Sequence, residues 1–307
     1  MSLLCYSIRG LRFLGVIILV GLICFNCSAQ EERKIELNTY LMQSTFRLRG
    51  DSFTTGSIET GTAFFIGRPS KKTPRQSYFV LVTAAHVLED IKGDDAQLIL
   101  RKVNKQDWSY EKVPYPIKIR QNGKPLWTRH DDKDVDIAVM YVPFTQKDVE
   151  ILEITLLPMD YLADEKLLVT IGIHPGDELM CLGYPFSQGW GSGDFPILRS
   201  GKIASALLPI KNNKVFLYDF EVFKGNSGGP VYMSEALRSI TFKERDKTFI
   251  SIKPVNIIIG IVIEEGVLIV KTETPYEKKE NTIPLKLAKV VHASLIRETI
   301  EKLPELP

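Results

Sequence analysis

Short β-strands broken by turn residues fill the chain from about Tyr40 onward, and this pattern limits the possible folds more than any other feature. One predicted strand spans residues 62–66 and ends at Gly67, before a loop rich in Pro and Lys. Further predicted strands span residues 78–83, 97–100, 117–120, 135–141, 178–182, 201–206, 215–222, 230–233, 257–263 and 266–271. Many short strands separated by Gly and Pro are typical of an all-β sandwich or barrel, and not of alternating α/β units.

The last part of the chain follows a different period. Between residues 285 and 303, apolar residues recur at helical spacing, with Lys and Glu on the other face. We expect a C-terminal α-helix there that packs against the preceding β unit. Residues 144–168 have mixed charge and weaker periodicity, so we expect them to connect two β units.

The composition is that of a globular protein with little net charge. Of the 307 residues, 44% are hydrophobic and 25% are charged, which is enough apolar material for two cores. The formal net charge is +2, and without Arg9 and Arg12 of the N-terminal segment 37 basic residues balance 37 acidic ones. A basic surface for nucleic acid is therefore not indicated.

The first 29 residues are typical of a targeting signal. Arg9 and Arg12 give a basic start, residues 13–25 are uninterruptedly apolar, and small residues precede a cleavage site after Ala29. The apolar run is short for a membrane-spanning helix, which needs about 20 residues. We expect export to the periplasm or the exterior. Membrane contact is expected only if the segment is retained as an anchor or is lipidated at one of its cysteines.

Outside that segment the chain has a single cysteine, Cys181, and so no internal disulfide is expected. Its neighbours are apolar, which favours a buried small hydrophobic residue over a nucleophile. The histidines and Cys181 lack the spacing of metal ligands, and no glycine-rich phosphate loop is recognisable. We therefore expect neither a metal nor any other cofactor.

Residues 225–231, Gly-Asn-Ser-Gly-Gly-Pro-Val, are the strongest candidate for a catalytic element. Glycines around Ser227 permit a sharp bend that leaves its hydroxyl unobstructed. The amides of Gly225 and Ser227 can also point to one place beside that hydroxyl. A nucleophile with two donors aimed at the charge that it creates is the core of acyl-transfer chemistry. The same residue types form ordinary tight turns, so the interpretation depends on the rest of the chain.

Four histidines could serve Ser227 as a base, and His86 is the best placed. It follows an apolar predicted strand and two alanines, whose small side chains let other groups approach. His130 lies in a charged loop, His174 precedes a turn, and His292 falls in the predicted terminal helix.

A catalytic histidine also needs an orienting acid, because a carboxylate fixes its tautomer and stabilises its imidazolium form. Among the acids at residues 131–136, Asp136 stands directly before an apolar strand. An acid in that place is partly buried and therefore needs a partner. We expect His86 to be that partner.

Three segments thus occur in the order His, Asp, Ser: residues 83–86 (Thr-Ala-Ala-His), 136–139 (Asp-Ile-Ala-Val) and 225–230 (Gly-Asn-Ser-Gly-Gly-Pro). In these segments the chain resembles the trypsin/chymotrypsin-like serine proteases, and among them the protease domain of the bacterial HtrA/Deg branch. Residues 61–66, 183–185, 200–205 and 283–284 match further segments of that branch.

The resemblance covers about residues 40–303 and implies a fold. It implies two antiparallel six-stranded β-barrels of the chymotrypsin type, with the active site in the cleft between them. The implied boundaries are a first barrel at about residues 40–143, a second at about 168–275 and a C-terminal helix at 285–303.

The resemblance also implies a role for each candidate residue. Ser227 would attack the scissile carbonyl, His86 would act as base and then acid, and Asp136 would orient His86. The amides of Gly225 and Ser227 would form the oxyanion hole.

Two features depart from the pattern of the wider family, and the first of them, Asn226, favours the HtrA/Deg branch over the digestive trypsins. Asn226 stands where digestive trypsins have the acid that pairs with a newly cut N-terminus, so we expect no activation by that route. Ile263, Glu264 and Glu265 match the segment that lines the substrate cleft, where small or aromatic residues are more frequent. The two glutamates are either solvated at a turn, or one faces the cleft and favours basic substrate side chains.

The expected function is that of an exported serine endopeptidase which cleaves protein or peptide substrates and serves in envelope protein quality control. No PDZ sequence follows the peptidase segment, so peptide sensing of the HtrA kind is not expected. The alternative is a catalytically silent relative that binds peptides or protein partners in the same cleft. A structural envelope protein with the same fold is a third, weaker reading.

Overall fold

The computed structural model describes residues 36–73, 76–152, 154–244, 247–273 and 278–306. The predicted signal at residues 1–29 lies outside the described residues. Within the described part of the chain, no helix is both long enough and apolar enough to span a membrane.

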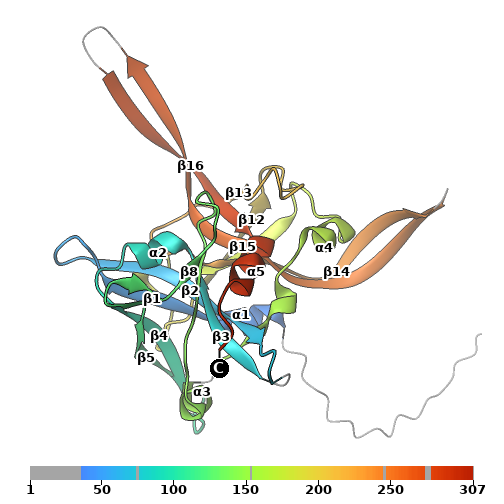
Figure 1. Cartoon of the computed structure of the whole chain (residues 1–307). Helices are drawn as coiled ribbons and strands as arrows, with labels where there is room; N and C mark the ends of the chain where they lie inside the picture. Colours follow the sequence, from blue (N-terminus) through green and yellow to red (C-terminus); the bar gives the residue numbers. More distant parts are fainter. Residues whose placement is uncertain (1–35, 74–75, 153, 245–246, 274–277, 307) are drawn as a thin grey trace, which may run out of the picture. The chain divides into compact units, whose positions relative to one another are not determined.

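The N-terminal half forms one antiparallel sheet (Figure 1). Its strand order is β5-β4-β1-β2-β3-β9-β8, and the short β10 pairs in parallel with β2. The strands are β1 (Thr45–Asp51), β2 (Ile58–Pro69), β3 (Ser77–Thr83), β4 (Asp95–Val103), β5 (Tyr110–Lys118), β8 (Thr128–Arg129), β9 (Ala138–Tyr141) and β10 (Leu157–Pro158). A separate small pair consists of β6 (Arg120–Gln121) and β7 (Lys124–Pro125).

The C-terminal half is a closed antiparallel barrel with the order β11-β12-β13-β16-β15-β14. The strands are β11 (Glu178–Gly183), β12 (Ile197–Ile203), β13 (Val215–Asp219), β14 (Pro230–Glu244), β15 (Lys247–Glu273) and β16 (Lys278–His292). Closure removes the free sheet edges that would otherwise invite aggregation.

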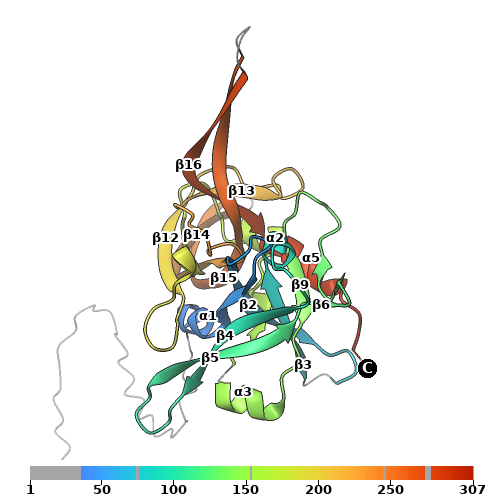
Figure 2. The same ribbon diagram turned by 90° about the vertical axis from the view of Figure 1, so that its left-hand side faces the viewer.

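Short helices connect and cover these strands. They are α1 (Leu37–Ser44), α2 (Ala85–Glu89), α3 (Gln146–Leu152), α4 (Glu165–Thr170) and α5 (Ala293–Glu301), with 3₁₀ turns η1 (Met159–Tyr161) and η2 (Pro185–Ser187). In Figure 2, α3 lies beside the β4 and β5 side of the N-terminal sheet.

The predicted all-β fold with a C-terminal helix is confirmed, but two details differ. The predicted helix at 285–303 begins only at Ala293, because residues up to His292 belong to β16. The second barrel consequently extends past the expected boundary near residue 275. In the described residues one sheet closes into a six-stranded barrel, while the N-terminal strands follow an open path.

The physical reason for the shorter helix is long-range pairing. Strand β16 bonds to β13 on one side and to β15 on the other, and so it completes the barrel. Val290 and Val291 are fully buried there, and β-branched side chains suit a pleated surface. The helical period of the local sequence carries no information about pairing with β13 and β15.

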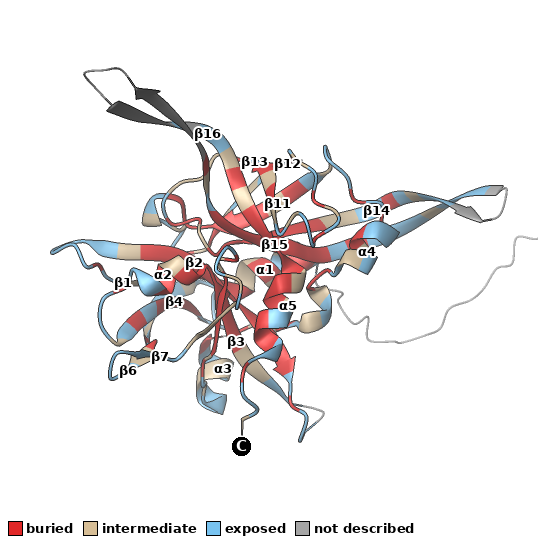
Figure 3. Ribbon diagram, turned by 45° about the horizontal axis from the view of Figure 1, so that its top comes forward, coloured by how far each residue is buried: buried red, intermediate tan, exposed pale blue. Residues whose placement is uncertain are grey.

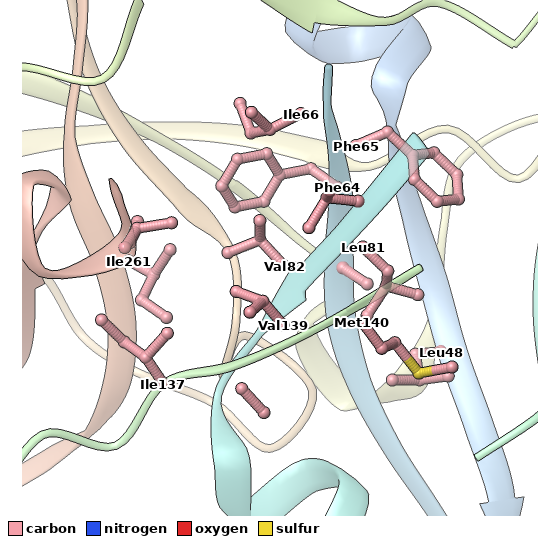
Figure 4. Packing of buried hydrophobic residues seen from close by; sticks show 14 of the residues in the cluster. Leu48, Phe64, Phe65, Ile66, Leu81, Val82, Ile137, Val139, Met140 and Ile261 are labelled. Carbon is pink, nitrogen blue, oxygen red and sulfur yellow. The ribbon is translucent and has the colours of Figure 1, made fainter. Parts of the chain in front are cut away.

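Buried residues, red in Figure 3, form two clusters. The first joins the N-terminal sheet to helix α5 and to one side of the barrel, and the second lies within the barrel. Figure 4 shows part of the first, in which Phe64, Val82 and Val139 lie opposite one another on neighbouring strands and Ile261 of the barrel strand β15 belongs to the same cluster. Full burial of one such side chain stabilises the fold by roughly 1.5–3 kcal/mol. Because Ile261 belongs to this cluster, the barrel and the sheet share a packed interface next to β15.

Candidate active site

Ser227 lies in the loop between β13 and β14, and two glycines of this loop have a backbone conformation that other residues rarely adopt. Gly225 has a φ of 100° and Gly228 a φ of 87°, which are left-handed values that favour glycine. A Cβ added to Gly225 would lie 2.1 Å from the carbonyl oxygen of Tyr184, and one on Gly228 would lie 2.1 Å from that of Thr62. Both glycines are therefore required by packing as well as by conformation.

Thr62 of β2 ties this loop to the N-terminal sheet. Its amide donates to the carbonyl of Ser227 at 2.8 Å, and its hydroxyl donates to the carbonyl of Gly225 at 2.7 Å. The Thr62 carbonyl in turn accepts from the hydroxyl of Thr83 at 2.7 Å. The two bonds of Thr62 to the Ser227 loop join residues more than 160 positions apart, so no local sequence pattern indicates them.

His86 follows strand β3, as expected, and lies on the short helix α2. Asp136 holds it at two points: Oδ1 accepts from the backbone amide of His86 at 3.0 Å, and Oδ2 lies 2.5 Å from Nδ1. Asp136 precedes β9, which pairs with β3. The expected partnership of His86 and Asp136 is thus present, and two adjacent strands produce it.

The same contact determines the charge of the pair. Burial lowers the pKa of His86, but the hydrogen bond and charge of Asp136, together with the charges of Asp90 and Glu264, raise the pKa above its ordinary value. Burial raises the pKa of Asp136, but His86 outweighs it and the net pKa is lowered. Asp136 is therefore ionised near neutral pH and stabilises the protonated ring.

The hydroxyl of Ser227 donates to the carbonyl of Ile263 at 3.1 Å. Among the described residues it has no hydrogen bond to His86. The loop that carries Ser227 nevertheless packs against the segment that carries His86, because a Cβ on Gly228 would lie 3.0 Å from the amide nitrogen of Ala84, two residues before His86. A serine side chain turns about one bond, and catalytic hydrogen bonds often tighten only when a substrate is bound.

The amides expected to form the oxyanion hole are those of Gly225 and Ser227. Within the described part of the chain, the amides of Gly225 and Ser227 have no hydrogen-bond acceptor, whereas those of Asn226, Gly228 and Gly229 donate to carbonyls. An amide pair of this kind beside a serine hydroxyl is suited to bind a negatively charged oxygen.

The predicted cleft residues Ile263, Glu264 and Glu265 lie inside strand β15 and not at the turn that one of the two readings expected, although Glu264 is solvated as that reading expected. The pairing of β15 with β16 shifts register on both sides of Glu264 and Glu265. Ile263 is buried, Glu265 is half-buried, and Glu264 is 57% exposed with its carboxylate 2.6 Å from Lys289 Nζ. The charge of Glu264 also reaches His86, which places this glutamate close to the proposed base.

In the part of the chain that the structure describes, neither the cysteine nor a metal site adds a further chemical group to this candidate site. Cys181 is almost completely buried, and burial raises the pKa of its thiol to about 12, so it stays a protonated hydrophobic residue. In the described residues, no three His, Cys, Asp or Glu side chains gather as a metal site would require.

A profile of the family described as "Trypsin-like peptidase domain" matches residues 61–236, which include His86, Asp136 and Ser227. The chain belongs to the trypsin-like peptidase family. This match confirms the predicted family and its class of enzyme, the serine endopeptidases. No curated protein sequence matches this trypsin-like peptidase.

Three solved structures are similar to this trypsin-like peptidase. The serine endoprotease from Yersinia pestis is 13% identical with a TM-score of 0.43, and the match covers 87% of this chain but only 66% of that one. The active form of the Rv3671c protease from M. tuberculosis is 17% identical, with a TM-score of 0.46 and coverages of 88% and 85%. The thermostable serine protease AL20 from an extremophilic microorganism is 10% identical, with a TM-score of 0.43 and coverages of 85% and 96%.

Proposed function

We propose that Ser227, His86 and Asp136 are the catalytic triad of an active endopeptidase. The observation that supports this most directly is the double contact of Asp136 with His86, beside a serine whose loop is bonded to the same sheet through Thr62. A partly buried acid that fixes one ring nitrogen leaves the other free to take a proton from a nucleophile.

The proposed reaction proceeds in two halves. Ser227 Oγ forms a bond to the scissile carbonyl carbon while His86 Nε2 takes its proton, and collapse of the intermediate breaks the C–N bond. The proton then passes from His86 to the leaving amine. Water, deprotonated by His86, hydrolyses the acyl-enzyme and restores Ser227.

The amides of Gly225 and Ser227 would bind the oxygen that becomes negative in each half. Both donors belong to the backbone, so they need no reorganisation when the charge forms. Loss of one such donor reduces kcat by about 10²–10³-fold in comparable sites.

A catalytically silent peptide-binding protein is the second candidate. The hydrogen bond from Ser227 to Ile263 favours it, since the hydroxyl donates to a backbone carbonyl instead of to His86. The presence of a paired histidine and acid favours the active enzyme, because a binding protein has no use for a carboxylate that stabilises imidazolium.

Labelling with a fluorophosphonate probe distinguishes the two candidates. We expect the wild-type protein to label, Ser227→Ala not to label, and His86→Ala to label at least about 10³-fold more slowly. Circular dichroism would verify that each variant is folded. A folded wild type that does not label would leave only the binding function.

The substrates are proposed to be unfolded or damaged envelope proteins, as the resemblance to the HtrA/Deg branch suggests. We propose that residues 1–29 direct export of the protein. The mature chain would then begin after Ala29, or the uncleaved segment would anchor it in the membrane. Cell fractionation with N-terminal sequencing tests this, and an intact cytoplasmic protein would contradict it.

A further inference from the structure

Residues 184–195, between β11 and β12, lie directly behind the proposed oxyanion hole. The carbonyl oxygen of Tyr184 would lie 2.1 Å from a Cβ on Gly225, and the amide nitrogen of Ser187 would lie 3.2 Å from it. The backbone of Gly225 therefore rests against this segment. Any shift of the segment would move the Gly225 amide.

The segment has a conformation that it would not keep unaided. Phe186, Ser187 and Asp194 have φ values of 55°, 62° and 53°, in the left-handed region that residues with side chains rarely occupy. Such residues persist only where their surroundings hold them, and they gather at functional sites.

Arg47 of β1 holds both ends of the segment. Its Nη1 donates to the carbonyl of Ser187 at 2.5 Å, and its Nε lies 3.0 Å from Oδ2 of Asp194. The side chains of Arg47 and Asp194 are only 14% and 8% exposed. Little solvent competes with this ion pair, so each charge depends on the other.

Arg101 of β4 contacts both strand β1 and the end of the 184–195 segment. It is 4% exposed and lies between the rings of Phe46 and Phe195, at 4.5 and 4.6 Å from their centroids. It donates to the carbonyl of Thr45, next to Phe46 in β1, and so fixes that strand. The strand that carries Arg47 is thereby held rigidly.

We propose that Arg47 and Asp194 are positioning residues, whose ion pair holds residues 184–195 in place so that the Gly225 amide points into the oxyanion hole. This inference rests on the proposed function, and it adds an account of what holds the oxyanion hole in place. Because both partners lie within the folded domain, the pair forms without cleavage of the chain. Asn226, which is buried and uncharged, has no part in it.

The test uses a variant that removes both charges, Arg47→Met/Asp194→Leu, since removal of one would leave the other buried and unpaired. Arg47→Lys, which keeps the charge but loses the planar fork, serves as a partial rescue. The control is Arg68→Met/Glu305→Gln, because Arg68 is also a buried arginine of the N-terminal sheet paired with a carboxylate, but it contacts the C-terminal tail.

The measurement is the rate constant of fluorophosphonate labelling together with the final fraction labelled. We expect the double variant to label at least about 10-fold more slowly but to the same final fraction, since a displaced donor weakens stabilisation of the developing charge. Arg47→Lys should lie between it and the wild type, and the control should label at the wild-type rate. Hydrogen exchange should accelerate in residues 184–195 of the double variant and not in the control.

Two results would overturn the inference: a rate within twofold of the wild type, or a smaller final fraction that labels at the wild-type rate. The second result would mean that the pair only stabilises the fold. Failure of the wild type itself to label would instead remove the proposed function, and the positioning role with it.

Discussion

His86 is subject to two opposing influences at the scale of the single residue. Burial favours its neutral ring, whereas Asp136 favours the protonated ring and prevails. The base is thus available only above a pKa that is raised from the ordinary 6.5. A raised pKa of this kind brings a general base closer to neutral working pH.

We therefore predict that labelling slows as the pH falls through a midpoint above 6.5. In Asp136→Asn the charge that raises the pKa is absent while burial remains, so the midpoint should fall below that of the wild type. NMR titration of the His86 ring measures both midpoints, and the rate should drop by about 10⁴-fold in the variant. An equal or higher pKa in Asp136→Asn would contradict the assignment of Asp136 as partner.

At the scale of the element, strand β15 has an irregular course where it passes the site. Register shifts on both sides of Glu264 and Glu265 bend the strand and change the direction of its side chains. Bulges of this kind are frequent beside active sites. Ile263 directly precedes the two glutamates, and its carbonyl accepts the hydrogen bond from the Ser227 hydroxyl.

We predict from this course that Glu264 faces the substrate cleft and favours basic side chains. Glu264→Gln/Glu265→Gln should reduce cleavage next to Lys and Arg by several-fold, measured by mass-spectrometric profiling of a peptide library. Glu235→Gln, which changes an acid on β14, serves as the control. An unchanged profile in the double variant would disprove the preference.

At the scale of the whole molecule, the site and the barrel depend on groups contributed by distant parts of the chain. His292 is one such group: it ends β16, pairs opposite Gly260 of β15 and packs on the ring of Phe216 at 4.9 Å. It is completely buried, and burial lowers its pKa to about 4 against the weaker opposing effect of the backbone at Asn213 and Leu207.

This burial predicts a pH dependence of stability. Between pH 6.5 and about 4 the unfolded chain binds a proton that folded His292 does not, so stability falls as the pH falls. The loss should amount to about 3 kcal/mol at pH 4. Urea unfolding should show a weaker pH dependence for His292→Phe, and the wild-type dependence for His174→Gln, which changes an exposed histidine. Equal dependence in all three proteins would refute the prediction.

The residues of the candidate site were predictable because their signals are local. A serine among glycines, a histidine after alanines and an acid before an apolar strand are each visible within a few positions of Ser227, His86 and Asp136. The strand pattern in the same way predicted an all-β fold. The boundary of the last helix was not predictable, since residues 285–292 carry a helical period but belong to β16, where residues 288–292 pair with neighbouring strands.

By itself, then, the sequence indicated which residues are candidates for the chemistry and determined which class of fold carries them, because turn chemistry and hydrophobic period act over short distances. Only the tertiary structure decided how these residues are held. The bonds of Thr62 to the Ser227 loop and the ion pair of Arg47 with Asp194 join positions more than 140 residues apart. Contacts at that separation arise when strands pair and pack, and no local pattern specifies them.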